Sequence, residues 1–159
     1  MAIPKTNAMR ILDSTGVSYG QLSYESNGFL DGVSVAHKIG KDPAQVFKTL
    51  VARGTSRNYY VFIIPVAEEL DLKAAAKAVG EKSVEMIKVA DITKVTGYIR
   101  GGCSPIGMKK TFRTVIDETC YLHDTVIFSA GKIGMQIELP PEDLIRIVPC
   151  EVAAVTVAP

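Results

Sequence analysis

The order of strand-like and helix-like segments constrains the fold of this chain most strongly. Segments rich in β-branched or aromatic residues indicate strands. Strands are predicted around Tyr19, Leu22 and Tyr24 and at Val46–Ala52, Tyr59–Val66, Ser83–Ile87, Arg113–Asp117, Thr125–Ser129, Ile133–Leu139 and Val152–Val157. Helices are predicted at Ile3–Ser14, Gly32–Ile39, Leu72–Val79, Ile92–Thr96 and Glu142–Ile147. Because the two kinds of segment do not alternate regularly, we predict an α+β fold around a mixed sheet rather than a doubly wound α/β domain.

Capping and turn residues place several element ends. Thr6 is the expected N-cap of the first helix, and Gly16 and Gly80 lie just past the ends of two helices. The segment 129–132, Ser-Ala-Gly-Lys, predicts a tight turn before the strand Ile133–Leu139. That strand alternates strictly, so its apolar residues should face the core, and its polar face is either solvated or one wall of a groove.

Length and charge limit the function classes. At 159 residues the chain is expected to form one domain, residues 1–159, that buries roughly 70% of the surface exposed by the unfolded chain. Lys and Arg total 18 against 17 Asp and Glu. Such a balance gives no global attraction to DNA or to an anionic membrane, so a polyanionic partner must be held by a local patch.

The cysteines indicate a reducing compartment. Cys103, Cys120 and Cys150 are odd in number, widely spaced and outside any Cys-x-x-Cys pattern, which argues against a disulfide framework and a structural zinc site. The N-terminus has no apolar core of signal-peptide length, and the apolar runs are too short to span a bilayer. We therefore expect a soluble, cytoplasmic protein without a metal or cofactor.

The segment Gly97–Lys110, with the sequence GYIRGGCSPIGMKK, is the first candidate for a site. Gly101 and Gly102 would let a ligand approach backbone amides, and Ser104 before Pro105 would fix the exit of the loop. An ordinary turn between two elements is the alternative. Cys103 is a candidate nucleophile, although neither histidine stands at a recognisable spacing from it.

Lys48 is the second candidate. Along its strand it shares a face with Val46 and Leu50, while Phe47, Thr49 and Val51 point to the other face. Both faces of the strand are largely apolar, so Lys48 has apolar neighbours whichever face is buried. A lysine is rarely buried without a partner, so Lys48 should extend to solvent, pair with an acid or line the mouth of a pocket.

Six segments of the sequence together resemble one protein family. The segments VFKTLV, LDLKAAAKAVG, KSVEMI, TGYIRGGCSPIGMKK, TVIDE and SAGKIGMQIEL are similar, in this order, to the YbaK/EbsC family of free-standing aminoacyl-tRNA editing proteins. Those proteins are similar to the editing domain inserted in bacterial prolyl-tRNA synthetases. The resemblance implies a mixed, barrel-like sheet of six or seven strands with surrounding helices. The implied activity is removal of cysteine from Cys-tRNA(Pro), with some action on Cys-tRNA(Cys).

The resemblance also implies site residues. The essential lysine of the family falls on Lys48, and a loop glycine that contacts the aminoacyl group falls on Gly101. Substrate-binding positions fall on Tyr24 and Ser129, and we add their motif neighbours Thr49, Gly102, Ser104, Pro105 and Gln136. Relatives carry Asp where this chain has Gln136, which removes a charge and argues against an anionic role there.

Several mechanisms stay open at this point. Cysteine could leave by attack of its own thiol on the ester, with Lys48 and amides near Gly101 stabilising the oxyanion. A related deacylase could instead remove another small amino acid, such as alanine, with an activated water. A non-catalytic module that binds a tRNA end or a synthetase, or that regulates expression through a partner, is the third alternative.

The expected partners are the CCA end of an aminoacylated tRNA and prolyl-tRNA synthetase. We expect Lys109, Lys110, Arg113 and Lys132 to contact tRNA phosphates. Binding measured across salt concentrations should then give a slope of log K against log [salt] no steeper than about −4, because each phosphate contact contributes about −0.9. A slope equivalent to about ten contacts would contradict this prediction.

Overall fold

The computed structural model describes residues 5–26 and 30–157. Its helices are α1 (Asn7–Thr15), α2 (Gly32–Lys38), α3 (Leu72–Val79), α4 (Ile92–Thr96) and α5 (Pro141–Ile147), with the 3-10 helices η1 (Val89–Asp91) and η2 (Glu118–Leu122). Its strands are β1 (Gly20–Ser23), β2 (Phe47–Gly54), β3 (Tyr59–Pro65), β4 (Val84–Met86), β5 (Arg113–Asp117), β6 (Val126–Lys132), β7 (Met135–Leu139) and β8 (Cys150–Ala153). The predicted α+β class is confirmed.

The described strands form two sheets. A mixed sheet has the order β4-β2-β3-β5-β8, in which β2 pairs antiparallel with β3 and β4, and β5 pairs parallel with β3 and β8. An antiparallel sheet has the order β1-β7-β6. A single parallel bridge between Val46 and Ile127 joins the two. The described strands therefore form two sheets joined at one bridge and no closed barrel, where the resemblance implied one barrel-like sheet.

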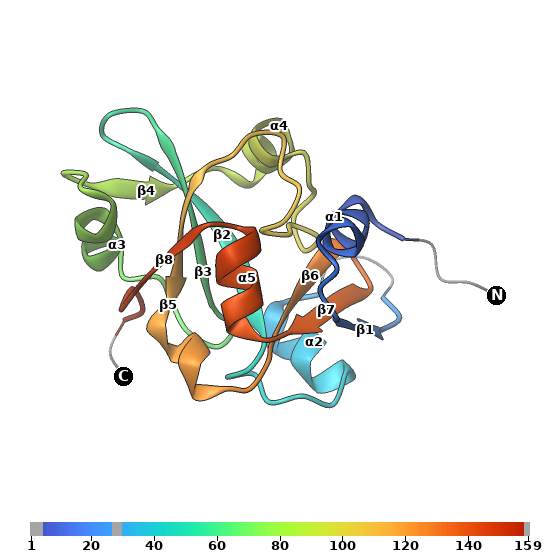
Figure 1. Cartoon of the computed structure of the whole chain (residues 1–159). Helices are drawn as coiled ribbons and strands as arrows, with labels where there is room; N and C mark the ends of the chain where they lie inside the picture. The colour runs from blue at the N-terminus through green and yellow to red at the C-terminus, as the bar shows by residue number, and fades with distance from the viewer. Residues whose placement is uncertain (1–4, 27–29, 158–159) are drawn as a thin grey trace.

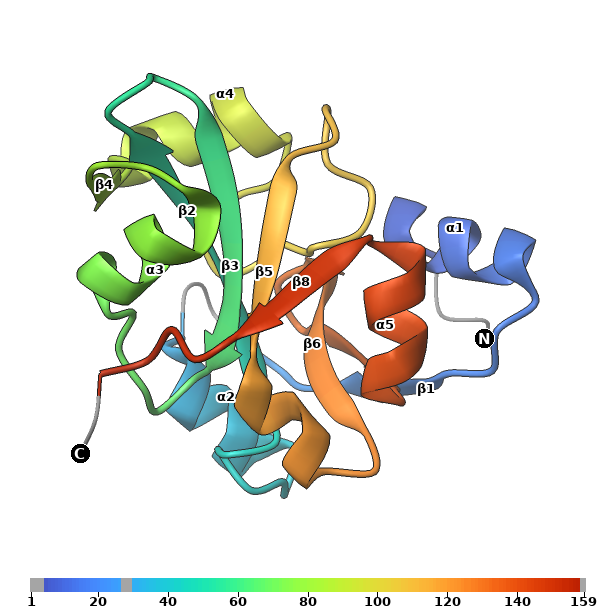
Figure 2. The ribbon, with the colours of Figure 1, turned by 60° about the vertical axis from the view of Figure 1, so that its left-hand side comes forward.

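The mixed sheet is covered on both faces. On one face, Phe62, Ile64 and Val115 pack with Ala75 and Val79 of α3. On the other face, residues such as Val61 and Ile63 pack against the antiparallel sheet, α1 and α5. Figures 1 and 2 show α3 beside β4 on one side, and α1 with β1 at the opposite end. Burial on both faces explains why β3 is apolar throughout instead of alternating.

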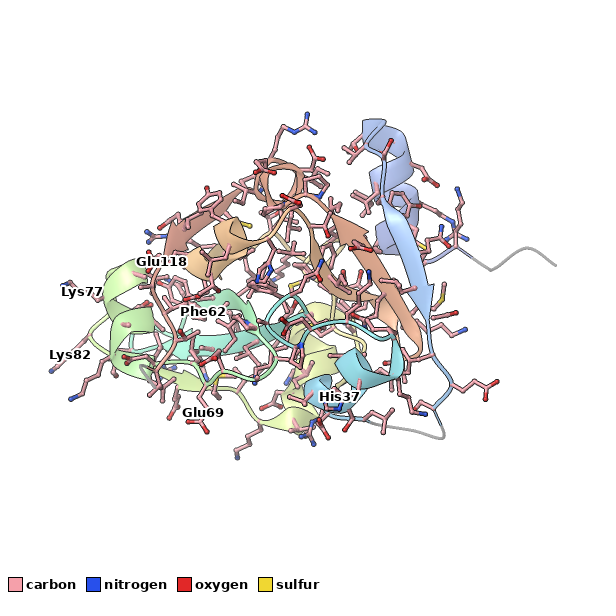
Figure 3. The ribbon with its side chains drawn as sticks, turned by 90° about the horizontal axis from the view of Figure 1, so that it is seen from below. His37, Phe62, Glu69, Lys77, Lys82 and Glu118 are labelled. Atoms are coloured by element: carbon pink, nitrogen blue, oxygen red, sulfur yellow. The ribbon has the colours of Figure 1, made fainter. Side chains whose placement is uncertain are left out.

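The view from below agrees with this layering. Figure 3 shows Phe62 among the interior side chains, while Lys77, Lys82 and Glu118 lie at the periphery. His37 lies on α2 and is exposed, as expected of a surface histidine. No helix in the described part of the chain is both long and apolar enough to cross a membrane.

Local signals placed the helix ends well. Thr6 caps α1 by accepting a hydrogen bond from the Met9 amide, and Gly16 and Gly80 follow α1 and α3 in the left-handed conformation. The first helix begins at Asn7, and Ile3 lies outside the described residues.

One turn and one strand were predicted in the wrong place. The segment 129–132, predicted as a turn, belongs to β6, and the turn lies at 133–134. A bulge between Ser129 and Lys132, with Gly131 at a φ of 99°, interrupts the strand pattern there. The last strand is Cys150–Ala153 instead of Val152–Val157. Beyond it, the Val155 amide donates to the Asp117 carboxylate and so leaves the ladder.

Asp117 joins three parts of the fold from a buried position. It is 1% exposed at the end of β5. Its Oδ1 accepts from the Val155 amide at 2.9 Å, and its Oδ2 accepts from the Thr119 amide at 3.2 Å and the Thr119 hydroxyl at 2.6 Å. The carboxylate thereby holds η2 and the C-terminal segment against β5.

Asp117→Ala should lower the free energy of unfolding by about 3 kcal/mol, because amides that bond a charged acceptor become unpaired. Urea denaturation measures this change. Glu118→Ala, at the exposed neighbouring position, should change the stability by about 0.5 kcal/mol or less. Equal effects of the two substitutions would contradict the role given to Asp117.

Candidate functional site

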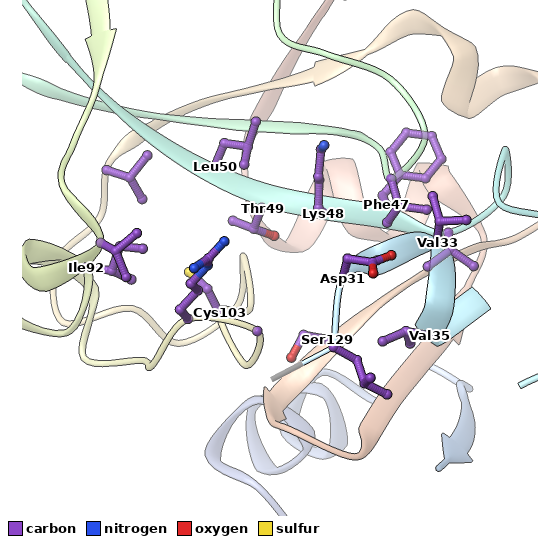
Figure 4. A pocket seen from close by; sticks show the side chains of 18 of the residues that line it. Asp31, Val33, Val35, Phe47, Lys48, Thr49, Leu50, Ile92, Cys103 and Ser129 are labelled. Carbon is purple, nitrogen blue, oxygen red and sulfur yellow. The ribbon is translucent and has the colours of Figure 1, made fainter. Parts of the chain in front are cut away.

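A cavity of about 560 Å³ runs along β2 and is lined by residues of α2, the β4–α4 region, the glycine loop and the β6–β7 hairpin. Figure 4 shows Lys48, Thr49, Cys103 and Ser129 around it. Its lining residues are Leu30, Asp31, Gly32, Val33, Val35, Val46, Phe47, Lys48, Thr49, Leu50, Val51, Val66, Met86, Ile87, Val89, Ile92, Arg100, Gly101, Cys103, Ser129 and Gln136. The fold therefore brings both sequence candidates, Lys48 and the Gly101 loop, to one cavity.

One edge of β2 is open where it borders this cavity. Residues 47–53 of β2 pair with β3 along the opposite edge, whereas β4 pairs only from Ala52 onwards and β6 reaches only Val46. The Val51 carbonyl accepts the Ile87 amide at 3.2 Å, so the main-chain groups of Val51 point to this edge. Alternation directs the N–H and C=O of Thr49 the same way, and neither has a strand partner among the described residues.

The Thr49 hydroxyl is the unusual polar group of this edge. Its oxygen is buried and has no hydrogen-bond partner among the described residues. An unpaired buried hydroxyl costs about 1–3 kcal/mol, and proteins rarely keep one without a reason. A ligand in the cavity would give the hydroxyl, and the main-chain groups beside it, the missing partners.

Lys48 leaves the other face of β2 (Figure 4) and is half-buried. Burial lowers the pKa of its ammonium group, and the negative charges of Glu69 and Glu68 partly oppose that change. Among the described residues no carboxylate lies within ion-pair distance, 4.0 Å, of its Nζ. Its charge is therefore available to a ligand that reaches around the open edge.

Two glycines determine the backbone path of the glycine loop. Gly101 lies in the left-handed region at a φ of 83°, which disfavours any side chain there. A Cβ on Gly102 would stand 3.2 Å from the Ile133 amide nitrogen, so Gly102 allows the loop to pack against the β6–β7 turn. The Gly102 amide donates to the Ile99 carbonyl, while the Gly101 amide has no partner in the described part of the chain.

Cys103 lines the cavity but is a poor nucleophile. Burial raises the pKa of its thiol to about 11, and a hydrogen bond with Thr96 offsets only part of this change. The thiolate, which is the reactive form, is therefore scarce at neutral pH. Among the described residues, no three His, Cys, Asp or Glu side chains are grouped so that they could hold a metal ion.

Ser129 and Gln136 form the far wall. They are cross-strand partners in the β6–β7 hairpin, and they are only 9% and 4% exposed. The Ser129 Oγ accepts the Gly131 amide at 3.1 Å, which leaves its hydroxyl proton to donate elsewhere. Both Ser129 and the side-chain amide of Gln136 line the cavity, so both side chains can bind a polar ligand.

Other predicted residues lie outside the cavity lining. Tyr24 follows β1, where its amide donates to the Gly134 carbonyl. Ser104 is fully buried, and its Oγ accepts the Ile106 amide. Pro105 lines a second, smaller cavity near α5, and Lys110 lies at that same cavity. The substrate-binding roles of these residues, and of Gly102, stay predictions.

The predicted tRNA contacts also differ in setting. Lys109, Lys110 and Lys132 are exposed. Arg113 instead donates to both oxygens of Glu151, at 2.6 and 3.0 Å, and to the carbonyls of Val79 and Ala78. Its guanidinium group has a structural role at the start of β5, which leaves it less suited to a phosphate.

Two charged residues of the cavity were missed in the sequence. Asp31 begins α2 as its N-cap, and Arg100 precedes Gly101. The N-cap pattern before α2 could have located Asp31, but no local signal relates it to β2. Only the packing of α2 against the Val46 bridge places it at the cavity.

A comparison with protein families places this chain in one of them. The sequence model of the aminoacyl-tRNA editing domain family matches residues 31–147, a span that includes β2, the glycine loop and the β6–β7 hairpin. The chain belongs to this family. The motifs therefore indicated the correct family, and every cavity-lining residue except Leu30 lies within the matched span.

Individual relatives extend the comparison. An Enterococcus faecalis protein, EbsC, named as a candidate Cys-tRNA(Pro)/Cys-tRNA(Cys) deacylase, is 46% identical over 153 residues, which cover 96% of this chain and 93% of that protein. The crystal structure of a candidate trans-editing enzyme for prolyl-tRNA synthetase has a TM-score of 0.83 at 20% identity, covering 98% of this chain and 100% of that one. Hypothetical protein APE2540 has a TM-score of 0.85 at 20% identity, covering 93% and 97%. At this identity the two structures establish the fold alone.

Thr49→Val should raise the free energy of unfolding by about 1 kcal/mol, because it replaces a buried unpaired hydroxyl by a methyl group of similar shape. Thermal and urea unfolding of the free protein measure the change. Thr114→Val is a useful control, since the Thr114 hydroxyl donates to the Phe112 carbonyl at 2.9 Å and its removal should destabilise the protein. Destabilisation by Thr49→Val would show that the hydroxyl is satisfied in the free protein.

Proposed function

We propose that this protein is a trans-editing deacylase that removes cysteine from Cys-tRNA(Pro), and also from Cys-tRNA(Cys). The observation that carries the proposal is the meeting of a half-buried lysine, an unpaired strand edge and the glycine loop at one cavity. Membership of the editing family and the 46% identity to EbsC support the same activity. A cavity of about 560 Å³ has room for an aminoacylated terminal nucleoside.

The physical need for such an enzyme follows from the limits of a synthetase pocket. One methylene contributes only about 1–3 kcal/mol to discrimination, so a pocket built for proline admits amino acids of similar size. A second site that hydrolyses the wrong ester corrects the error. We infer that this protein acts beside prolyl-tRNA synthetase in the cytoplasm, because its near-neutral charge gives little affinity for free tRNA.

The attacking group comes from the substrate. Cys103, the cysteine of the cavity, is held in its thiol form by burial and cannot serve as a strong nucleophile. The substrate cysteine has an ordinary thiol pKa near 8.5. Its thiolate attacks its own carbonyl carbon, a C–S bond forms, the ester C–O bond breaks, and the ribose oxygen ends with the thiol proton. The product is a four-membered thiolactone and uncharged tRNA.

The protein contributes position and electrostatic stabilisation. The Lys48 ammonium and the Gly101 amide stabilise the negative charge that develops on the carbonyl oxygen. Thr49, Ser129 and Gln136 hold the aminoacyl group and the terminal ribose in the geometry that favours attack. This division of labour requires no catalytic base from the chain.

Deacylation assays on Cys-, Ala- and Pro-charged tRNA test the proposal. Lys48→Ala should lower kcat/KM for Cys-tRNA by about 100-fold or more, the usual loss for one oxyanion donor. Cys103→Ser should retain most of the activity. With the wild type, kcat/KM for Cys-tRNA should rise through about pH 8.5 as the substrate thiol ionises.

Three assay results would contradict the proposed mechanism or function. Loss of turnover in Cys103→Ser, with Lys48→Ala unaffected, would overturn the mechanism. Removal of alanine as fast as cysteine would indicate an activated water, because alanine has no thiol. Binding of charged tRNA without any discharge would identify a non-catalytic module.

A further inference from the structure

Charge is distributed unevenly along the cavity. Its charged lining residues in the described chain are Asp31, Lys48 and Arg100, so Asp31 is the single carboxylate among them. Gln136, on the opposite wall, contributes a neutral amide. Figure 4 shows Asp31 on the α2 side of the cavity and Lys48 on β2.

The Asp31 carboxylate is fixed in position and ionised. Its Oδ1 accepts the Ser34 amide and its Oδ2 accepts the Ser34 hydroxyl, both at 2.9 Å. These bonds lower the pKa of the carboxyl group below its ordinary value. A carboxylate oxygen can accept more than one hydrogen bond, so both oxygens keep the capacity to bind a further donor.

Asp31 and Lys48 are reached from the same side of β2. Val46, which shares the strand face of Lys48, packs with Ala36 and Val33 of α2, and Asp31 is the residue that begins this helix. No ion pair joins Asp31 to Lys48 among the described residues, so neither charge neutralises the other. A ligand between them would meet a carboxylate at one end and an ammonium at the other.

An aminoacyl ester has the matching arrangement of groups. Its carbonyl oxygen becomes negative during attack, and its α-amino group, with an ordinary pKa near 7.7–8.0 for such amines, is largely protonated at neutral pH. A cation placed in a cavity with Lys48 and Arg100 needs an anion nearby. Asp31 is the lining residue that supplies one.

We propose that Asp31 binds the α-ammonium group of the aminoacyl ester whose carbonyl oxygen contacts Lys48, an assignment that rests on the proposed deacylase function. It makes Asp31 a specificity-determining residue for a free α-amino group. Acyl-tRNAs whose α-amino group is blocked, such as peptidyl-tRNA, carry no α-ammonium group beside the ester and lose this contact. The protein would thereby favour newly charged tRNA over growing chains.

The test compares two oxygen esters of tRNA that both carry a free thiol and differ in the amino group alone, Cys-tRNA and 3-mercaptopropionyl-tRNA. The wild type should cleave Cys-tRNA with a kcat/KM about fivefold higher, the effect of one exposed charge pair. Asp31→Asn should lower kcat/KM for Cys-tRNA by the same factor and leave the other substrate unchanged. The preference for the amino group should then disappear.

Control variants separate charge from folding. Asp31→Asn and Asp31→Ser both keep a side-chain oxygen that can cap α2, and thermal unfolding reports whether the helix is intact. Asp42→Asn changes an exposed carboxylate that bonds the Ala44 amide outside the cavity, and it should keep the wild-type preference.

The substrate comparison distinguishes a wrong assignment of Asp31 from a wrong deacylase function. If folded Asp31→Asn and Asp31→Ser keep the wild-type ratio of the two substrates, the assignment of Asp31 is wrong while the deacylase function stands. If the wild type cleaves neither ester, the proposed function is wrong and the assignment falls with it.

Discussion

The unpaired edge of β2 is the constraint on which the site depends. The strand is held along its opposite edge by β3, and its ends are fixed by β4 and by the Val46–Ile127 bridge. Thr49, midway between these anchors, keeps a buried hydroxyl and main-chain groups without partners in the described structure. The hydrophobic core, which includes the buried side chains of Val51, Val61 and Phe128, offsets this unfavourable arrangement. Closing the two sheets into one barrel would pair this edge and remove the site.

Around that edge, the chain supplies groups that can bind and orient a substrate, and few groups that could react with it. Lys48 provides a charge, the glycine loop provides a backbone amide, and the hairpin residues Ser129 and Gln136 provide hydrogen bonds. Burial keeps the Cys103 thiol protonated. This set suits a reaction in which the substrate carries its own nucleophile, because positioning and charge stabilisation alone can supply a large part of the rate enhancement.

Local sequence signals predicted the elements better than their assembly. The helices Leu72–Val79 and Ile92–Thr96 and the strand Arg113–Asp117 agree with the structure at both ends, because capping residues or β-branched runs define them. The turn predicted at 129–132 was wrong because a glycine bulge inside a strand has the composition of a turn. The division into two sheets depends on one bridge between distant segments, and no local pattern encodes it.

The site was predictable to the extent that its residues lie in continuous motifs. Lys48, Thr49, Gly101, Ser129 and Gln136 all line the cavity, as their motifs suggested. Asp31 and Arg100 could not be related to it, because their positions follow from the packing of α2 and from the path of the loop. Conversely, Ser104 belongs to the same loop motif, but its hydroxyl bonds the loop itself.

The most direct test of the central claim is a structure of the protein with a stable analogue in which cysteine is joined to the terminal adenosine by an amide. We expect the analogue to lie along the open edge of β2, with its carbonyl oxygen within hydrogen-bond distance, about 3 Å, of the Lys48 Nζ or the Gly101 amide. We also expect the Thr49 hydroxyl to gain a partner. An analogue bound outside this cavity, or bound with its carbonyl against the Cys103 sulfur and away from Lys48, would contradict this claim.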